Sequence, residues 1–358
     1  MSSYEQIAGL PLEIESYSLE GLEFEAPGFT RLTTVIRLKG GGHEGVGEDV
    51  VYDALDHVAL QDAGPALDLA GSHTIDSFSE LLEGFDLFPN PPERDVSRDY
   101  RRWAFESAAL DLALRQAGTT LHHQLGREPR PVDFVVSMRL TPPGSEEIST
   151  LEPVSRRLAI YPGLRFKLDP TNDWTDELIA QLAETGAIDS LDLKGQYKGT
   201  PVDVDTDPEL YSKLIVAFPD AWLEDPDVND ETRPILEPVA DRVTWDAPIH
   251  SVADIEDREW PPKMVNIKPS RFGPLSALFA AYDHCADRNI GAYGGGQWEL
   301  GPGRGQIQYL ASIFHPDTAN DTAPSGYNTA GEEPGLPTSP LAPEPSEIGF
   351  RWGEWSER

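Results

Sequence analysis

The sequence predicts an α/β protein in which an N-terminal α+β capping domain, residues 1–130, precedes a closed barrel of parallel strands, residues 131–315. The first domain mixes long alternating strands with one strong helix. From about residue 131, short apolar strands alternate with helices seven or eight times. Such alternation is typical of a parallel sheet covered by helices. Seven or eight successive units, rather than five or six, favour a closed barrel over an open sheet.

In the first domain, the alternating run "FTRLTTVIRLKG" (29–40) predicts a strand, and the glycine-rich segment 40–50 follows it. Residues 98–118, "RDYRRWAFESAALDLALRQAG", predict a long helix. Trp103 and Leu110 recur at helical spacing there, and Gly118 supplies a stop signal.

The barrel units follow in order. Strands are predicted at 131–138, 163–170, 188–193, 221–225, 242–246, 264–268 and 290–298, and helices at 175–186, 207–218, 231–241, 251–257, 273–288 and 303–314. Thr175 caps the first of these helices and Gly186 ends it. The tail, 316–358, begins with a stretch rich in Pro, Gly, Ser and Thr and ends in the aromatic segment "IGFRWGEW". We expect this tail to pack back on the N-terminal domain.

The charge composition indicates which classes of binding partner are unfavourable. The net charge is −34, from 62 acidic and 28 basic residues, which should repel nucleic acid and anionic membranes. This balance indicates a surface adapted to high salt, where screening tolerates like charges. The single cysteine, Cys285, lies in an alanine-rich helical pattern and is expected to fill the core. With no signal peptide and no membrane-length apolar run, we expect a soluble cytoplasmic protein.

Charged residues recur at the C-terminal ends of the predicted barrel strands: Lys167, Asp192, Glu224, Asp246 and Lys268. Their spacings are 25, 32, 22 and 22 residues, each about one strand-plus-helix unit. Side chains at such ends face one common mouth. Taken alone, each carboxylate is typical of a turn residue or a helix cap. Lys268 taken alone is typical of a lysine whose ammonium group reaches solvent at the barrel rim. Five such residues in phase, in a chain poor in lysine, indicate a site.

The chemistry of these residues favours a divalent cation. Three neighbouring carboxylates raise one another's pKa and do not all stay ionised without a counter-charge. Mg²⁺ prefers oxygen ligands and keeps positions open for water or substrate. A partly desolvated lysine near a cation has a lowered pKa and can act as a general base near neutral pH.

These residues resemble those of the enolase superfamily, most closely its muconate-lactonizing-enzyme-like branch, over nearly the whole chain. "GVGED" and "AFESAALDLALRQAG" are similar to the family's capping domain, and "RFK" is similar to its Lys-x-Lys motif. The resemblance implies a (β/α)₇β TIM-like barrel, Lys167 and Lys268 as acid/base residues, and Mg²⁺ on Asp192, Glu224 and Asp246. It also implies removal of the α-proton of a carboxylate substrate to give a metal-stabilised enediolate.

The sequence departs from the family's pattern at four positions. Arg165 replaces the first motif lysine and is expected to lower the pKa of Lys167. Lys194 stands where the family often has asparagine, Ala247 follows Asp246 in place of glutamate, and Pro274 replaces a glycine. None of these departures removes a metal ligand or a general base.

The candidate substrate-binding residues are Lys194, Glu299, Asn266, Phe24 and His43, with Phe24 and His43 on the capping loops 16–29 and 40–48. Racemisation or epimerisation, cycloisomerisation and syn-dehydration all remain open. Two alternatives are an acid-sugar dehydratase of the mandelate-racemase-like branch and a non-catalytic barrel that binds a metal or a carboxylate. Lys268 stands where that branch usually has histidine, which argues against the dehydratase. The resemblance also implies a homo-oligomer.

Overall fold

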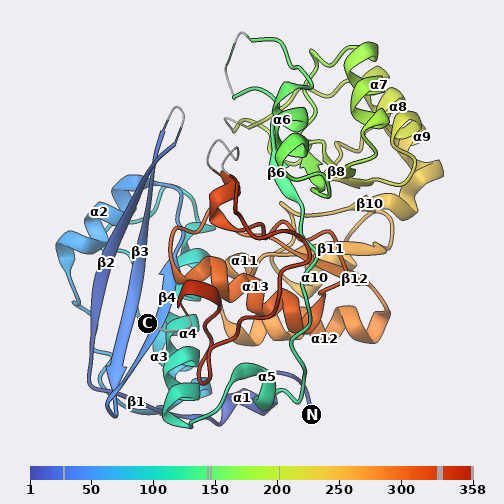
Figure 1. The fold of residues 1–358 in the computed structure, drawn as a ribbon. Helices are drawn as coiled ribbons and strands as arrows, with labels where there is room; N and C mark the ends of the chain where they lie inside the picture. Colours follow the sequence, from blue (N-terminus) through green and yellow to red (C-terminus); the bar gives the residue numbers. More distant parts are fainter. Residues whose placement is uncertain (27–28, 143–144, 146, 201, 329–333, 356–358) are drawn as a thin grey trace.

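The computed structural model describes residues 1–358 except 27–28, 143–144, 146, 201, 329–333 and 356–358. An N-terminal α+β region lies beside a larger α/β region (Figure 1). Among the described residues, no helix is both long enough and apolar enough to cross a membrane.

The N-terminal region is built on a three-stranded antiparallel sheet in the order β2–β3–β4. Its strands are β2 (Ser16–Ala26), β3 (Phe29–Gly40) and β4 (His43–Asp49), and β1 (Pro11–Ile14) pairs separately with β5 (Gly71–Thr74). The helices of this region are α1 (Glu5–Ala8), α2 (Ala54–Ala63), α3 (Ile75–Glu83), α4 (Ser97–Gln116) and α5 (Leu121–Gln124).

Helix α4 packs directly against β4 because two glycines of the predicted glycine-rich segment allow a close approach. A Cβ atom on Gly45 would lie 2.2 Å from the carbonyl oxygen of Ala108, and one on Gly47 would lie 2.1 Å from that of Ala104. Any larger residue would push the helix away from the sheet. The long helix is therefore buried on nearly all sides.

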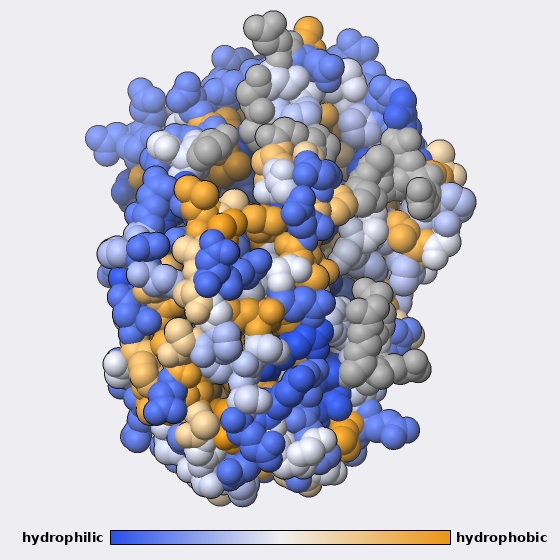
Figure 2. Space-filling view, turned by 90° about the vertical axis from the view of Figure 1, so that its left-hand side faces the viewer, coloured by the Kyte–Doolittle hydropathy of each residue, from blue (hydrophilic) through white to orange (hydrophobic). Residues whose placement is uncertain are grey.

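The outer face of the N-terminal region carries exposed apolar side chains. Figure 2 shows hydrophobic residues gathered in a band between hydrophilic ones on this side of the molecule. The exposed large hydrophobic residues of the region include Phe29 on β3 and Leu55 and Val58 on α2.

The second region alternates strands and helices, as predicted. Its strands are β6 (Val136–Met138), β7 (Phe166–Leu168), β8 (Ile188–Asp192), β9 (Trp222–Glu224), β10 (Val243–Thr244), β11 (Met264–Ile267) and β12 (Gly291–Gly294). Its helices are α6 (Glu152–Ile160), α7 (Asp176–Glu184), α8 (Pro208–Ala217), α9 (Arg233–Leu236), η1 (Glu237–Arg242), α10 (Val252–Glu256), α11 (Pro269–Phe272), α12 (Leu275–Arg288) and α13 (Pro302–Phe314), with η2 (Ser325–Asn328) and η3 (Gly353–Trp355) in the tail.

Every strand pair in this region is parallel. One sheet has the order β10–β9–β8–β7–β6, and a second contains β11 and β12. Parallel bridges join Trp245 to Val265, Gly295 to Asp321, and Phe134 to Asn320. The prediction of an α/β fold with a parallel sheet is confirmed, and the carboxyl ends of the strands lie on one side of it.

Several local features differ from the sequence prediction. The predicted capping loops 16–29 and 40–48 are largely the strands β2 and β4. The helix predicted at 231–241 is split into α9 and the 3₁₀ helix η1, where Pro238 lies at the start of η1 and has no N–H to donate. Helix α6 was not predicted. Cys285 is buried in α12, as expected. The domain bounds 1–130 and 131–315 stay predictions.

The C-terminal tail returns to α4. The backbone N–H of Phe350 donates to Asp111 Oδ1 at 2.8 Å, and Arg351 Nε donates to Asp111 Oδ2 at 2.7 Å. Leu341 forms an antiparallel bridge with Val132, in the segment before β6. The tail thus spans both regions.

Candidate metal centre

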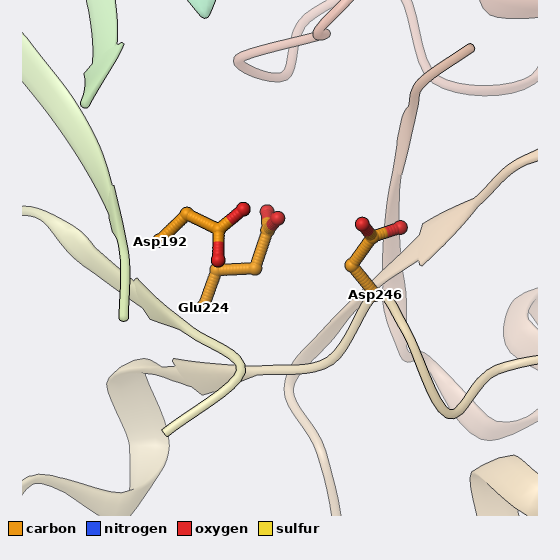
Figure 3. Close-up of side chains that lie close together, drawn as sticks. All are labelled: Asp192, Glu224 and Asp246. Atoms are coloured by element: carbon orange, nitrogen blue, oxygen red, sulfur yellow. The ribbon is translucent and has the colours of Figure 1, made fainter. Parts of the chain in front are cut away.

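Asp192, Glu224 and Asp246 lie together at the carboxyl ends of three neighbouring strands. Asp192 ends β8, Glu224 ends β9 and is its register partner, and Asp246 follows β10. Each is at most 1% exposed, and one oxygen atom from each lies within 4.8 Å of the others. Figure 3 shows Asp192 and Glu224 side by side, with the carboxyl group of Asp246 across from them. The sequence spacing therefore identified a real spatial cluster.

Two buried lysines flank the three carboxylates. Lys167, on β7, contacts Glu224 Oε1 and lies 3.5 Å from Asp192 Oδ2. Lys268, which follows β11, places its Nζ atom 2.8 Å from Asp246 Oδ2. The two ammonium groups thus contact different members of the triad, as expected for lysines one strand before and one strand after it.

Further side chains contact the triad. Lys194 contacts Asp192 Oδ2 and lies 3.4 Å from Asp169 Oδ2, so this third cation belongs to the site. Asp246 accepts from Tyr197 at 3.0 Å and pairs with Arg271 at 2.7 Å. The Tyr293 hydroxyl donates to Glu224 Oε2, and the buried Asp225 accepts the backbone N–H of Asp246 at 2.8 Å. Asp321 lies 3.4 Å from Lys167 Nζ and so contacts the flanking lysine, not the triad itself.

The three carboxylates differ in the direction of their pKa shifts. Burial raises the pKa of Glu224 well above its ordinary value, and Asp192 and Asp246 add to the effect over the opposing influence of Lys167. Burial also opposes ionisation of Asp246 and Asp192. Arg271 and Lys268 nevertheless hold the pKa of Asp246 far below its usual value, and Lys194 and Lys167 lower that of Asp192 to about 2.

The sequence predicts a lowered pKa for Lys167. For the effect of the protein's own groups on Lys167, this prediction is wrong. Burial does act in the expected direction, but Glu224, Asp321 and Asp192 together raise the pKa of Lys167 well above its ordinary value. Three carboxylates around one ammonium favour its charged form more than desolvation disfavours it.

Arg165 does not take the position predicted for it. Its guanidinium donates to Asp189 Oδ1 at 3.0 Å through Nε and to the carbonyl of Gly186. Asp189 is the extra residue of β8 at the register shift between β7 and β8, where Phe166 pairs with Ile188 and Lys167 with Ser190. This carboxylate draws Arg165 toward the entry to β8, away from the carboxyl ends where Lys167 makes its contacts.

His43 is also not part of the site. It opens β4 at the turn beside Gly41, where a Cβ atom on Gly41 would lie 3.6 Å from Gln116 Nε2, at the end of α4. Tyr100, in the first turn of α4, faces Arg271. Gln116 is sixteen positions further along the helix than Tyr100, which corresponds to about 24 Å.

The other three predicted substrate-binding residues are Asn266, Glu299 and Phe24. Asn266, on β11, is 1% exposed, and neither polar atom of its side chain has a hydrogen-bond partner among the described residues. Glu299 is buried in the loop after β12 and accepts the backbone N–H of Gln297 at 2.6 Å. Phe24 is the register partner of Arg31, whose guanidinium donates to carbonyls of that loop.

Sequence reasoning missed Arg271, Tyr197, Tyr293, Asp169 and Asp321. Arg271 stands three residues after Lys268, on the short helix α11, and this proximity was the one available signal. Tyr293 reaches Glu224 from β12, and Asp321 reaches Lys167 from the segment bridged to the residue after β12, so nothing local in the sequence marks them.

The donor set suits a hard divalent cation. Three buried carboxylates converge with oxygen atoms close enough to share one ion, and Mg²⁺ favours such ligands. The nearby Asn266 amide, buried and unpartnered, indicates that the surrounding space accommodates a further polar group.

Two family models match most of the chain. The family described as "Domain of unknown function (DUF8230) C-terminal domain" matches residues 128–329, and its N-terminal counterpart matches residues 5–124. An o-succinylbenzoate synthase from Geobacillus stearothermophilus is 25% identical over 230 residues. That match covers 63% of this chain and 59% of the synthase, less than two thirds of its length.

Two solved structures share the fold. A member of the enolase superfamily from Listeria innocua has a TM-score of 0.62 at 17% identity, covering 88% of this chain and 86% of that one. A dipeptide epimerase from Methylococcus capsulatus, complexed with a Mg ion, has a TM-score of 0.64 at 17% identity, covering 86% of this chain and 89% of that one. The predicted resemblance to the enolase superfamily is confirmed at the level of the fold, and the relatives with stated activities are enzymes.

Proposed function

The chain belongs to the DUF8230 family, and from this and its enolase-superfamily fold we propose that it is a Mg²⁺-dependent lyase or isomerase acting on a small carboxylate substrate. The reaction begins with removal of the proton α to the carboxylate. One observation carries the proposal: three buried carboxylates share a site with two buried lysines that contact different members of the triad.

Each residue has a role in this proposal. Asp192, Glu224 and Asp246 would hold Mg²⁺, which supplies positive charge for the substrate carboxylate and for the negative charge that develops on it. Lys167 and Lys268 would carry protons to and from the α-carbon. A divalent cation on the triad would offset the carboxylates that raise the pKa of Lys167. Asn266 donates to the substrate through its amide, Lys194 offsets the charge of Asp192, and Glu299 and Phe24 line the approach from the loop after β12 and the capping domain.

The possible reactions differ in how many of the two lysines they use. Racemisation or epimerisation uses both lysines, one as base and one as acid. Cycloisomerisation and syn-dehydration use one, and the other remains an electrostatic anchor. The acid-sugar dehydratase alternative is disfavoured, because Lys268 stands where that branch usually has histidine. We further propose that the parallel strands close into a (β/α)₇β barrel through the single bridges between β10 and β11 and around residues 320–321, and that the protein acts as a homo-oligomer.

A non-catalytic binding protein is the second candidate, and the contact of Lys194 with Asp192 is the observation that favours it. An ammonium group on a metal ligand competes with the ion for that ligand.

Solvent-deuterium exchange separates the two candidates. The protein is incubated in D₂O with Mg²⁺ and a broad panel of carboxylates, and exchange at the α-carbon is followed by NMR. The proposal expects exchange with at least one carboxylate. Lys167→Ala and Lys268→Ala should each change which hydrogen is exchanged or abolish the exchange. Binding of carboxylates without exchange of any would support the binding protein instead.

A further inference from the structure

Tyr293 makes a contact that the proposed chemistry does not use. It lies on β12, and its hydroxyl donates a hydrogen bond to Glu224 Oε2 on β9. Tyr293 is 5% exposed and Glu224 is fully buried, so this bond lies in the interior of the protein. The phenol has one proton, and the nearby Thr244 hydroxyl, 3.4 Å away, donates its own proton to the carbonyl of Met264 at 2.8 Å.

The two oxygen atoms of Glu224 therefore have different partners. Oε2 accepts from Tyr293, whereas Oε1 is in contact with Lys167. A tyrosine hydroxyl is a fixed donor on a rigid ring, while an ammonium group on a four-carbon chain can move away. One oxygen is thus held in place, and the other is the one that a cation can take over when Lys167 moves.

We propose that Tyr293 is a positioning residue for the metal ligand Glu224, holding its carboxylate so that Oε1 is presented as a single ligand atom to a divalent cation. This inference depends on the proposed function only in that it needs the triad to bind the ion.

The physical reason is the geometric demand of the ion. Mg²⁺ requires a nearly ideal octahedral arrangement, so a carboxylate that is free to rotate binds it poorly or in the wrong mode. Outer-shell hydrogen bonds that orient a ligand are typically worth about 10–100-fold in metal affinity. Glu224 needs such help more than its neighbours do, because Asp246 is already held by Arg271 and Asp192 by the loop at Lys194.

The test is Tyr293→Phe, which removes one oxygen atom and keeps the ring. Isothermal titration calorimetry measures the Kd of Mg²⁺ for the full chain, and urea unfolding in EDTA measures stability separately. We expect the Kd to rise at least tenfold. Tyr282→Phe is the matched control, because that buried hydroxyl faces His315 at 3.4 Å rather than the triad, and its Kd should equal that of the wild type.

The outcomes separate the inference from the proposed function. A Tyr293→Phe protein whose Kd stays within twofold of wild type overturns the positioning role, even if its stability in EDTA falls. A wild-type protein that binds no Mg²⁺ overturns the proposed function and this inference with it. Tyr293→Met, which lacks the donor but is more adaptable in shape, replaces Tyr293→Phe if the latter does not fold, with the same expected weakening.

Discussion

Lys268 and Asp246 form a buried ion pair in which the ammonium nitrogen lies 2.8 Å from carboxylate Oδ2. Asp246 has a second cation, because Arg271 lies 2.7 Å from its other oxygen. Glu224, by contrast, pairs with Lys167 and accepts from Tyr293. The two lysines are therefore not equivalent. Asp246 keeps Arg271 as a paired cation when Lys268 is removed, whereas Glu224 loses its paired cation when Lys167 is removed.

This asymmetry predicts that Lys167→Met destabilises the protein in EDTA more than Lys268→Met does. Removing one partner of a buried pair leaves an uncompensated charge and typically costs about 3–5 kcal/mol. Arg271 should reduce that cost for Lys268→Met. Urea unfolding of both variants and the wild type gives the two free energies. Equal losses, or the reverse order, would contradict the asymmetry.

Lys194→Met is predicted to bind Mg²⁺ more tightly than the wild type, by at least tenfold. The variant removes a positive charge that contacts a candidate ligand, Asp192, so the repulsion between the ammonium group and the ion disappears. Lys194→Arg keeps the charge and should leave the Kd close to wild type. Calorimetric titration at constant ionic strength compares the three proteins, and a weaker Kd for Lys194→Met would refute the prediction.

Glu48→Gln is predicted to destabilise the fold by about 1–3 kcal/mol, the range for a lost buried hydrogen bond. Glu48, on β4, accepts the backbone N–H groups of Leu300, Gly301 and Gly303 at the start of α13, at 2.6–3.0 Å. A glutamine NH₂ group would face these donors with a donor of its own. Chemical unfolding measures the change.

The matched control for that variant is Glu44→Gln. Glu44 lies on the same strand, but its carboxylate forms a partly exposed pair with Arg37. Pairs of that kind contribute less than about 1 kcal/mol. If both variants lose the same stability, the contacts of Glu48 with α13 are not what stabilises this junction.

Acid should destabilise the protein through His315. Burial lowers the pKa of His315 to about 4, so the folded protein keeps this imidazole neutral. An unfolded histidine titrates near pH 6.5, so the unfolded chain binds the proton first as the pH falls. The free energy of unfolding is thus at its full value above about pH 6.5 and falls towards pH 4, by up to about 3 kcal/mol.

Substituting His315 with glutamine should remove this contribution, so that unfolding takes up about one proton fewer between pH 6.5 and 4. Equilibrium unfolding across that range gives the slope for each protein. An unchanged slope in His315→Gln would show that another group is responsible.

The net charge of −34 predicts a melting temperature that rises with salt. Like charges repel across the surface of the folded state, and salt shortens the screening length from about 10 Å at 0.1 M to about 3 Å at 1 M. Thermal unfolding followed by circular dichroism over this range, with KCl as the salt, checks the expectation. A melting temperature independent of KCl would argue against a surface adapted to high salt.

The sequence by itself determined which residues stand at the carboxyl ends of the strands. Asp192, Glu224 and Asp246 recur with the length of one strand-plus-helix unit. Parallel strands bring such positions to the same edge of the sheet, regardless of the conformation of the loops between them. The α/β class with a parallel sheet and the positions of the flanking lysines followed from the same periodicity.

The tertiary structure alone decided what each of these side chains contacts. Tyr293 reaches the triad from β12, and Asp321 reaches Lys167 from the segment bridged to Gly295. Arg165 is drawn to Asp189 at a register shift, and His43 lies at the far end of α4. Hydrogen bonds and ion pairs depend on strand register and on close approach across the fold. The position of a residue along its strand determines the direction in which its side chain points. The group that this side chain contacts depends on which segment of the folded chain lies opposite it.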